Sequence, residues 1–88
     1  MQMYVTYDEE ADVLFAKWGT REPGDGGGSR DFGLGRFVEF DAYGKPVAVE
    51  FLDASHGVDL AGIPNADEIR AALRRLGALI EAQVGTPA

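Results

Sequence analysis

The sequence predicts an α+β domain: a four-stranded antiparallel β-meander, with strand order 1-2-3-4, and one C-terminal α-helix packed on one face. Three observations favour this class. Short alternating segments rich in aromatic and β-branched residues occupy the first 52 positions, turn residues separate them, and one helical apolar stripe follows. With 88 residues, of which 45% are hydrophobic, the chain suits a single globular domain spanning residues 1–88.

Residues 3–7 and 13–18 are the first two predicted strands. The segments MYVTY and VLFAKW alternate, and the acidic turn DEEAD separates them. The inward side chains of the second strand are predicted to be Leu14, Ala16 and Trp18. The alternative set would bury the charge of Lys17.

Residues 19–35 are predicted to form a glycine-rich loop, because GTREPGDGGGSRDFGLG holds most of the chain's 12 glycines. An irregular connection of this length in a small domain is usually mobile or functional, and a flexible surface loop is the preferred interpretation. If the loop were shorter, Arg30, Phe32 and Leu34 would extend the next strand backwards. The segment contains no GxxxxGK[ST] pattern, which excludes a P-loop at the level of the motif.

Residues 36–41 and 46–52 are predicted to form a hairpin around Tyr43 and Gly44, since glycine readily takes the positive φ that tight turns need. A two-residue loop would place Ala42 opposite Lys45. This register gathers the apolar side chains on one face and leaves a more acidic face opposite. The apolar face then holds Val38, Phe40, Val47, Val49 and Phe51, together with Arg36 opposite Phe51.

Residues 66–84 are predicted to be the helix. Its apolar stripe consists of Ile69, Ala72, Leu73, Leu76, Leu79, Ile80 and Gln83. Such a helix spans ~28 Å, whereas four strands make a sheet only ~15–20 Å wide, so the helix must overhang or run diagonally. A two-fold mate would cover an overhanging stripe most simply, and we therefore expect a homodimer with Leu76, Gly77 and Ile80 as interface candidates.

The charge and composition of the chain limit its function. Fifteen acidic against eight basic residues give a net charge of −7, which argues against nucleic-acid binding by the chain alone and makes a basic protein a candidate partner. Without cysteine, the chain offers no disulfide, thiolate zinc site or cysteine nucleophile. With no signal-peptide pattern and no apolar run of ~20 residues, we expect a cytoplasmic protein that does not contact the membrane.

Acidic residues are the only candidates for a chemical site. Asp8, Glu10 and Asp12 alternate like the start of a calcium loop, but Val13 and Gly19 stand where that loop needs glycine and a bidentate glutamate. We therefore expect neither a metal ion nor another cofactor.

A second acidic group lies on and just beyond the predicted hairpin: Glu39, Asp41, Glu50 and Asp53. If Asp8 or Asp12 approached it, paired carboxylates could share a proton or hold a divalent ion. The preferred alternative is structural, with Asp8 and Asp53 closing Asx-type turns and Glu50 paired with Arg36 or Lys45.

His56 is the only histidine and follows Ser55 directly. Neighbours in sequence rarely acquire the geometry of a Ser-His-Asp triad. An exposed loop histidine is therefore the preferred interpretation.

Two segments, YDEEADVLF and FDAYGKPVAVEFLDAS, resemble the small bacterial and archaeal family called domain of unknown function 2283. Its pattern is roughly Y-D-x-x-x-D-x-L-Y, then D-x-x-G-x-x-V-G-x-E-x-L-D-A-S. The positions that match are Tyr7, Asp8, Asp12, Leu14, Asp41, Gly44, Val47, Glu50, Leu52, Asp53, Ala54 and Ser55. Phe15 and Ala48 stand where the family usually has Tyr and often has Gly.

The resemblance implies a small β-meander, and the family has no established activity. It marks four signature acids: Asp8, Asp12, Glu50 and Asp53. Some members look like neighbours of small toxin-like proteins, which implies a role in neutralising such a basic partner.

The expected function is a non-catalytic interaction or assembly module. The alternative is a small metal-dependent or acid–base enzyme that uses the signature acids as a carboxylate cluster. The enzyme needs all four carboxylates within a few ångströms in one concave pocket, whereas the binding module needs an apolar patch, either exposed or buried between two copies.

Overall fold

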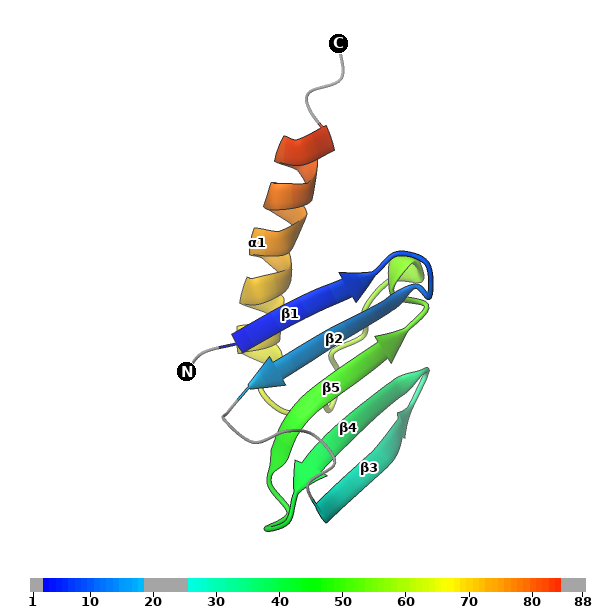
Figure 1. The fold of residues 1–88 in the computed structure, drawn as a ribbon, viewed down its shortest axis with the longest axis vertical. Coiled ribbons are helices and arrows are strands. Elements are labelled where there is room, and N and C mark those ends of the chain that lie inside the picture. The colour runs from blue at the N-terminus through cyan, green and yellow to red at the C-terminus, as the bar shows by residue number, and fades with distance from the viewer. Residues whose placement is uncertain (1–2, 19–25, 85–88) are drawn as a thin grey trace.

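The computed structural model describes residues 3–18 and 26–84, with the side chains in these ranges placed as far as Leu76. The fold is α+β, with one antiparallel sheet and one C-terminal helix (Figure 1). The elements are β1 (Met3–Asp8), β2 (Val13–Trp18), β3 (Gly26–Gly33), β4 (Arg36–Asp41), β5 (Pro46–Leu52), the short 3₁₀ turn η1 (Ala54–His56) and α1 (Ala66–Val84).

The sheet contains five strands in the order β1-β2-β5-β4-β3, so the predicted four-stranded meander of order 1-2-3-4 is wrong. β5 occupies the centre and pairs with β2 on one side and β4 on the other. Taken alone, the β4–β5 hairpin offers two edges for pairing, and its sequence pattern does not predict which edge pairs with β2. Because β3 occupies the β4 edge, β2 pairs with β5 instead.

The additional strand, β3, lies within the segment that was predicted to be an irregular loop. β3 and β4 are joined by Leu34 and Gly35, whose φ values of 57° and 72° suit a type I′ hairpin turn. A Cβ atom at Gly27 would collide with the carbonyl oxygens of Phe40 and Asp41. Glycine at this position therefore allows β3 to approach β4 closely. Residues 19–25 of the predicted loop lie outside the described residues.

The β4–β5 hairpin keeps the predicted register along most of its length. Arg36 lies opposite Phe51 and Val38 opposite Val49, as the apolar pattern predicts. The register shifts beyond Glu39.

The loop of this hairpin differs from the prediction. Phe40 pairs with Pro46, and the Asp41 amide donates to the Lys45 carbonyl at 2.8 Å, so the loop has three residues and not the predicted two. The carboxylate of Asp41 explains the difference, because its Oδ1 accepts the amides of Tyr43 at 2.8 Å and Lys45 at 3.0 Å.

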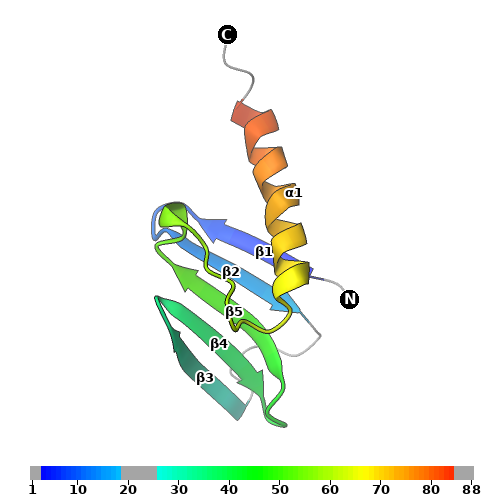
Figure 2. The same ribbon diagram turned by 180° about the vertical axis from the view of Figure 1, so that it is seen from behind.

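The core lies between α1 and the sheet face that we call the inner face. The predicted inward set of β2 is confirmed, since Leu14, Ala16 and Trp18 are at most 6% exposed. The other core side chains come from β4, β5, α1 and the connection of residues 57–65, which crosses the inner face (Figure 2). They are Val38, Phe40, Val49, Phe51, Ile63 and Ile69.

The helix meets the sheet at one edge. α1 contacts β1 and buries Ile69 and Ala72, while Leu73 and Leu76 remain half-buried. Figures 1 and 2 show that α1 starts behind the N-terminal end of β1 and then extends past the β1 edge of the sheet. Neither α1 nor any other helix within residues 3–18 and 26–84 has the length and apolarity that crossing a membrane requires.

Candidate functional site

Three signature residues meet at one end of the sheet, and we call Tyr7, Asp12 and Ser55 the Asp12 corner. Oδ1 of Asp12 accepts a hydrogen bond from the Tyr7 hydroxyl at 2.8 Å and another from the Ser55 amide at 2.8 Å. Its Oδ2 accepts the Ser55 hydroxyl at 2.6 Å, and its backbone carbonyl accepts the Ala54 amide at 3.1 Å. The corner thus fastens the β1–β2 turn to the chain that leaves β5.

Local turns position the residues of this corner. After β1, Oδ1 of Asp8 accepts the amides of Glu10 and Ala11 at 3.0 and 3.1 Å, which makes an Asx-type turn. Asp12 and Asp53 have left-handed φ values of 56° and 52°, a conformation that aspartate tolerates better than most residues. Asp8 therefore closes an Asx-type turn, as the structural alternative proposes, whereas the side chain of Asp53 makes no such capping hydrogen bond.

Hydrogen bonding sets the protonation states in the corner. The bonds from Ser55, followed by the bond from Tyr7, lower the pKa of Asp12 below its ordinary value. The same bond to Asp12 raises the pKa of Tyr7. At neutral pH the corner therefore holds a carboxylate that already accepts three hydrogen bonds, and this carboxylate is poorly suited to act as a general base.

The four signature acids do not gather in one place. Asp12 and Asp53 lie together with His56, whereas Glu50 points to the outer face of the sheet, opposite Phe15 and Phe37. Burial of Glu39, followed by repulsion from Glu50, raises the pKa of Glu39. No hydrogen-bond partner for Oε2 of Glu39 occurs among the described residues.

One carboxylate oxygen each from Asp12 and Asp53 and one ring nitrogen of His56 lie within 4.8 Å of one another. Such a group could ligate a divalent ion. The carboxylate of Asp12, however, already accepts three hydrogen bonds, which leaves an ion at most one free lone pair on Oδ2. Asp53 and His56 are exposed, and the geometry favours the hydrogen-bonded arrangement over a metal centre.

Ser55, His56 and Asp12 also lie close together, but not in the order of a catalytic triad. A triad places histidine between serine and aspartate. Here the Ser55 hydroxyl lies 2.6 Å from Asp12 Oδ2 and 3.4 Å from His56 Nδ1, and the imidazole is 83% exposed. The hydroxyl donates directly to the carboxylate, so His56 does not activate it as a nucleophile.

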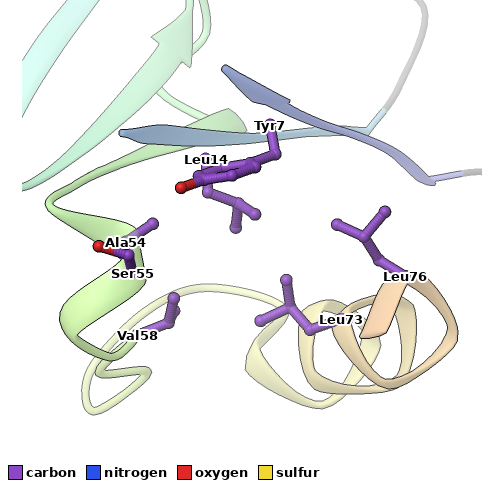
Figure 3. Close-up of a pocket in the computed structure, with 7 residues that line it drawn as sticks. All are labelled: Tyr7, Leu14, Ala54, Ser55, Val58, Leu73 and Leu76. Carbon is purple, nitrogen blue, oxygen red and sulfur yellow. The ribbon is translucent and has the colours of Figure 1, made fainter. Parts of the chain in front are cut away.

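An apolar pocket of about 340 Å³ lies beside the Asp12 corner, between the sheet and α1 (Figure 3). Its lining residues are Tyr7, Leu14, Ala54, Ser55, Val58, Leu73 and Leu76. A second pocket, of about 180 Å³, is lined by Met3, Val5, Ala72, Arg75 and Leu76. Because Leu76 lines both pockets, it lies between an apolar hollow and a smaller, more polar one that contains Arg75.

Of the three predicted interface residues, the structure describes the side chain of one, Leu76. Leu76 is half-buried and lines both pockets. The side chains at positions 77 and 80, where Gly77 and Ile80 were predicted to contribute, lie outside the described part of the chain.

Arg36 is a structural residue that sequence reasoning missed. It is 8% exposed on the inner face, and its guanidinium donates to four backbone carbonyls. The acceptors are Phe32 at 2.8 Å, Gly33 at 3.0 Å, Asp59 at 3.1 Å and Ala61 at 2.6 Å. The available signal was an arginine on the apolar face of the predicted hairpin, where a buried charge needs partners.

A family model described as "Protein of unknown function (DUF2283)" matches residues 4–55. No curated protein and no solved structure matches the chain. The matched segment contains the Asp12 corner and ends before α1. Since it covers more than half of the 88 residues, this protein belongs to the family of domain of unknown function 2283.

Proposed function

We propose that the protein is a non-catalytic interaction module that assembles with a second copy of itself. The observation that carries this proposal is the position of α1, which rests on the sheet at β1 and extends past the sheet edge (Figure 1). A helix in this position leaves part of its length without a layer of its own chain to pack against.

The surroundings of α1 support a partner on this side of the molecule. Leu73 and Leu76 are only half-buried, and both line the larger, mostly apolar pocket beside the helix. The sequence of the last eight helical residues, GALIEAQV, is mostly apolar. Removing apolar surface from water contributes ~25 cal/mol per Å², so a mate that covers this stripe would be favoured. A two-fold dimer is the simplest closed solution.

The geometry of the signature acids supports a non-catalytic role. An enzyme built on them would need the four carboxylates in one pocket, but Glu50 lies on the outer face and Asp12 lies at the end of the sheet. The hydrogen bonds of Asp12 give it a structural role, and no catalytic role is needed to account for its position.

The mass of the protein in solution tests the proposal. Sedimentation equilibrium at micromolar concentration should give twice the chain mass of 9.4 kDa. Leu76→Gln should shift the equilibrium towards the monomer, whereas the matched control Arg74→Gln, an exposed position on the same helix, should leave it unchanged. A wild-type protein that stays monomeric over the whole concentration range would refute self-assembly.

A second candidate function is the neutralisation of a basic toxin-like protein. One observation favours it: Asp8, Glu9, Glu10 and Asp53 are all exposed, in a chain of net charge −7. Such a surface attracts basic partners, and salt weakens the attraction. Co-purification from the native host at low and high salt should therefore recover a basic protein that high salt releases. Recovery of no basic protein at low salt would reject this function.

A further inference from the structure

We propose that the second copy joins at the free edge of β1, in antiparallel pairing centred on Val5, and that each α1 then covers the partner's pocket beside Tyr7. The inference rests on the proposed self-assembly and adds its surface and register to it. Two five-stranded sheets would become one continuous sheet, with both helices on the same face.

The two edge strands of the sheet differ in how well they are protected. β3 carries register shifts between Gly26 and Ser29 and between Asp31 and Gly33, and Gly28 has a φ of 75°. Its exposed side chains include the charged Arg30 and Asp31. Bulges and charges of this kind prevent an edge strand from pairing with another chain. β3 is therefore a poor docking edge.

Apart from the charged Asp8 at its end, β1 lacks these protective features. Its register against β2 is unbroken from Met3 opposite Trp18 to Asp8 opposite Val13. Residues 3–7, MYVTY, contain no charge, proline or glycine. Within the described part of the chain β1 pairs only with β2, so its other edge presents regularly spaced N–H and C=O groups. This is the edge that a further strand can extend.

The alternation of β1 restricts the register of a symmetric pair. Met3, Val5 and Tyr7 are half-buried on the inner face, whereas Tyr4 and Thr6 are exposed on the outer face. Residues that oppose each other in an antiparallel pair point to the same face. One residue must therefore oppose its own copy in the partner, with the two-fold axis midway between them.

Centring the axis on Val5 uses all five uncharged residues. Val5 then opposes the partner's Val5, Met3 opposes the partner's Tyr7, and Tyr4 opposes the partner's Thr6. Centring it on Thr6 would instead place the Asp8 carboxylate opposite the partner's Tyr4 and shorten the apolar overlap. The Val5-centred register is the better match.

The position of α1 agrees with this register. α1 packs near the N-terminal part of β1, where Met3 and Val5 line the smaller pocket with Leu76. In the antiparallel pair, the N-terminal part of the partner's β1 lies beside Tyr7. The partner's α1 extends past its own sheet edge and would therefore reach across Tyr7, over the 340 Å³ pocket.

The dimensions also fit. Residues 77–84 span ~12 Å at the helical rise, which is about two and a half strand spacings of ~4.8 Å. The two helices would cross the strands about four residues apart, or ~13 Å, which is wider than the 8–10 Å at which helices pack directly and leaves room for both on one face. Each overhanging segment thus has the partner's pocket to cover.

Single cysteines test the register, because the natural chain has none. Val5→Cys would place two thiols at the axis, with Cα atoms ~4.5–5.5 Å apart, within the range that a disulfide bridges. Mild oxidation at micromolar concentration should convert most of this variant to a covalent dimer on a non-reducing gel. Thr6→Cys and Ser29→Cys, exposed positions on the two edges, are the controls and should form little covalent dimer on the same gel. The diagonal separation of the two Thr6 positions is ~8 Å, too long for a disulfide.

A mixture of Tyr4→Cys and Thr6→Cys gives a second test that leaves Val5 and the inner face intact. These exposed positions oppose each other between copies, so the mixture should form a mixed disulfide faster than either variant alone. Circular dichroism of every variant should match the wild-type spectrum. Faster cross-linking of Thr6→Cys alone or of Ser29→Cys than of Val5→Cys would overturn the interface. A wild-type dimer in which neither pairing cross-links would overturn it too and leave self-assembly standing, whereas a monomeric wild type would remove both proposals.

Discussion

Arg36 and the Asp12 corner each hold one point of the irregular connection between β5 and α1. Arg36 is buried, whereas Asp12 is only partly buried. Asp12 fixes the start of this connection at Ala54 and Ser55, while Arg36 fixes its middle at Asp59 and Ala61. The Arg36 guanidinium is buried and satisfied by four carbonyl groups, whereas the side chain of Asp12 is 23% exposed. Water can replace lost partners at Asp12 far better than at Arg36.

This difference teaches that the two anchors serve different purposes. The loss of a buried ion leaves several polar groups without partners, so Arg36 should carry more of the folding stability. The Asp12 corner should mainly fix the wall of the apolar pocket, to which both Tyr7 and Ser55 belong. Substitutions can separate these two roles.

The largest effect is expected for Arg36→Met. It keeps the apolar stem but leaves the four carbonyl acceptors without their donors, and we expect the free energy of unfolding to fall by about 3 kcal/mol. Urea unfolding measures this loss. The matched control is Arg30→Met, which removes an exposed guanidinium 4.6 Å from the Phe40 ring and should cost about 0.5 kcal/mol. Equal losses for the two variants would contradict the dominance of the buried anchor.

A smaller loss of folding stability is expected for Asp12→Asn. The amide retains one acceptor oxygen but presents its NH₂ group to a hydroxyl or an amide that donated to the carboxylate. Thermal unfolding should show a melting temperature a few degrees below that of the wild type and above that of Arg36→Met. Asp53→Asn, which keeps a residue tolerant of the left-handed φ, should melt like the wild type. If Asp12→Asn lowered the melting temperature as much as Arg36→Met, the difference in exposure between Asp12 and Arg36 would not determine their contributions to stability.

Acid should remove the contribution of the Asp12 corner selectively. Because folding lowers the pKa of Asp12, its contribution is full above the ordinary value of 3.8 and is lost as the pH falls through the lowered native pKa. The stability difference between wild type and Asp12→Asn should therefore be constant near neutral pH and shrink below about pH 3.8. Urea unfolding at a series of pH values measures it. If the stability difference between wild type and Asp12→Asn grew in acid, it would contradict a lowered pKa for Asp12 in the folded protein.

The smallest effect on stability is expected for Tyr7→Phe, which removes a single hydroxyl. Its main signature is spectroscopic, because the hydrogen bond to Asp12 raises the pKa of Tyr7 above the ordinary 10.0. Folding therefore favours the protonated phenol, and this contribution is lost as the pH rises through the raised native pKa. Subtracting the alkaline absorbance titration of Tyr7→Phe from that of the wild type isolates Tyr7. Its midpoint should lie above 10.0 and move down in Asp12→Asn.

Local patterns of the sequence predicted the parts of the fold that depend on local physics. The alternation in residues 13–18 identified the buried set Leu14, Ala16 and Trp18 because each side chain's face follows from its place in the strand. Strand order was not predicted because the pairing of β2 with β5 depends on competition between sheet edges. β3 was missed because the glycine that permits close approach at Gly27 is also typical of irregular loops.

Of the predicted signature acids only Asp12 belongs to the corner, while Tyr7 and Ser55 were marked only as positions that match the family pattern. The family pattern singled out Asp12 and Ser55 without a physical reason for either. The structure supplies one in the contact between them, which spans 43 positions of the chain. The buried role of Arg36 was missed because its four partners are backbone carbonyls, and these leave no mark in a sequence pattern.

The central position of β5 has a kinetic consequence. The β1–β2 hairpin and the β3–β4–β5 unit each form through contacts between neighbouring segments, whereas the β2–β5 pairing must close a long loop and should therefore form later. The contact between Asp12 and Ser55 can form only after this step. Stopped-flow measurements should show that Asp12→Asn accelerates unfolding and leaves the folding rate almost unchanged. Asp12 and Ser55 of the family signature would then join two parts of the sheet that form independently.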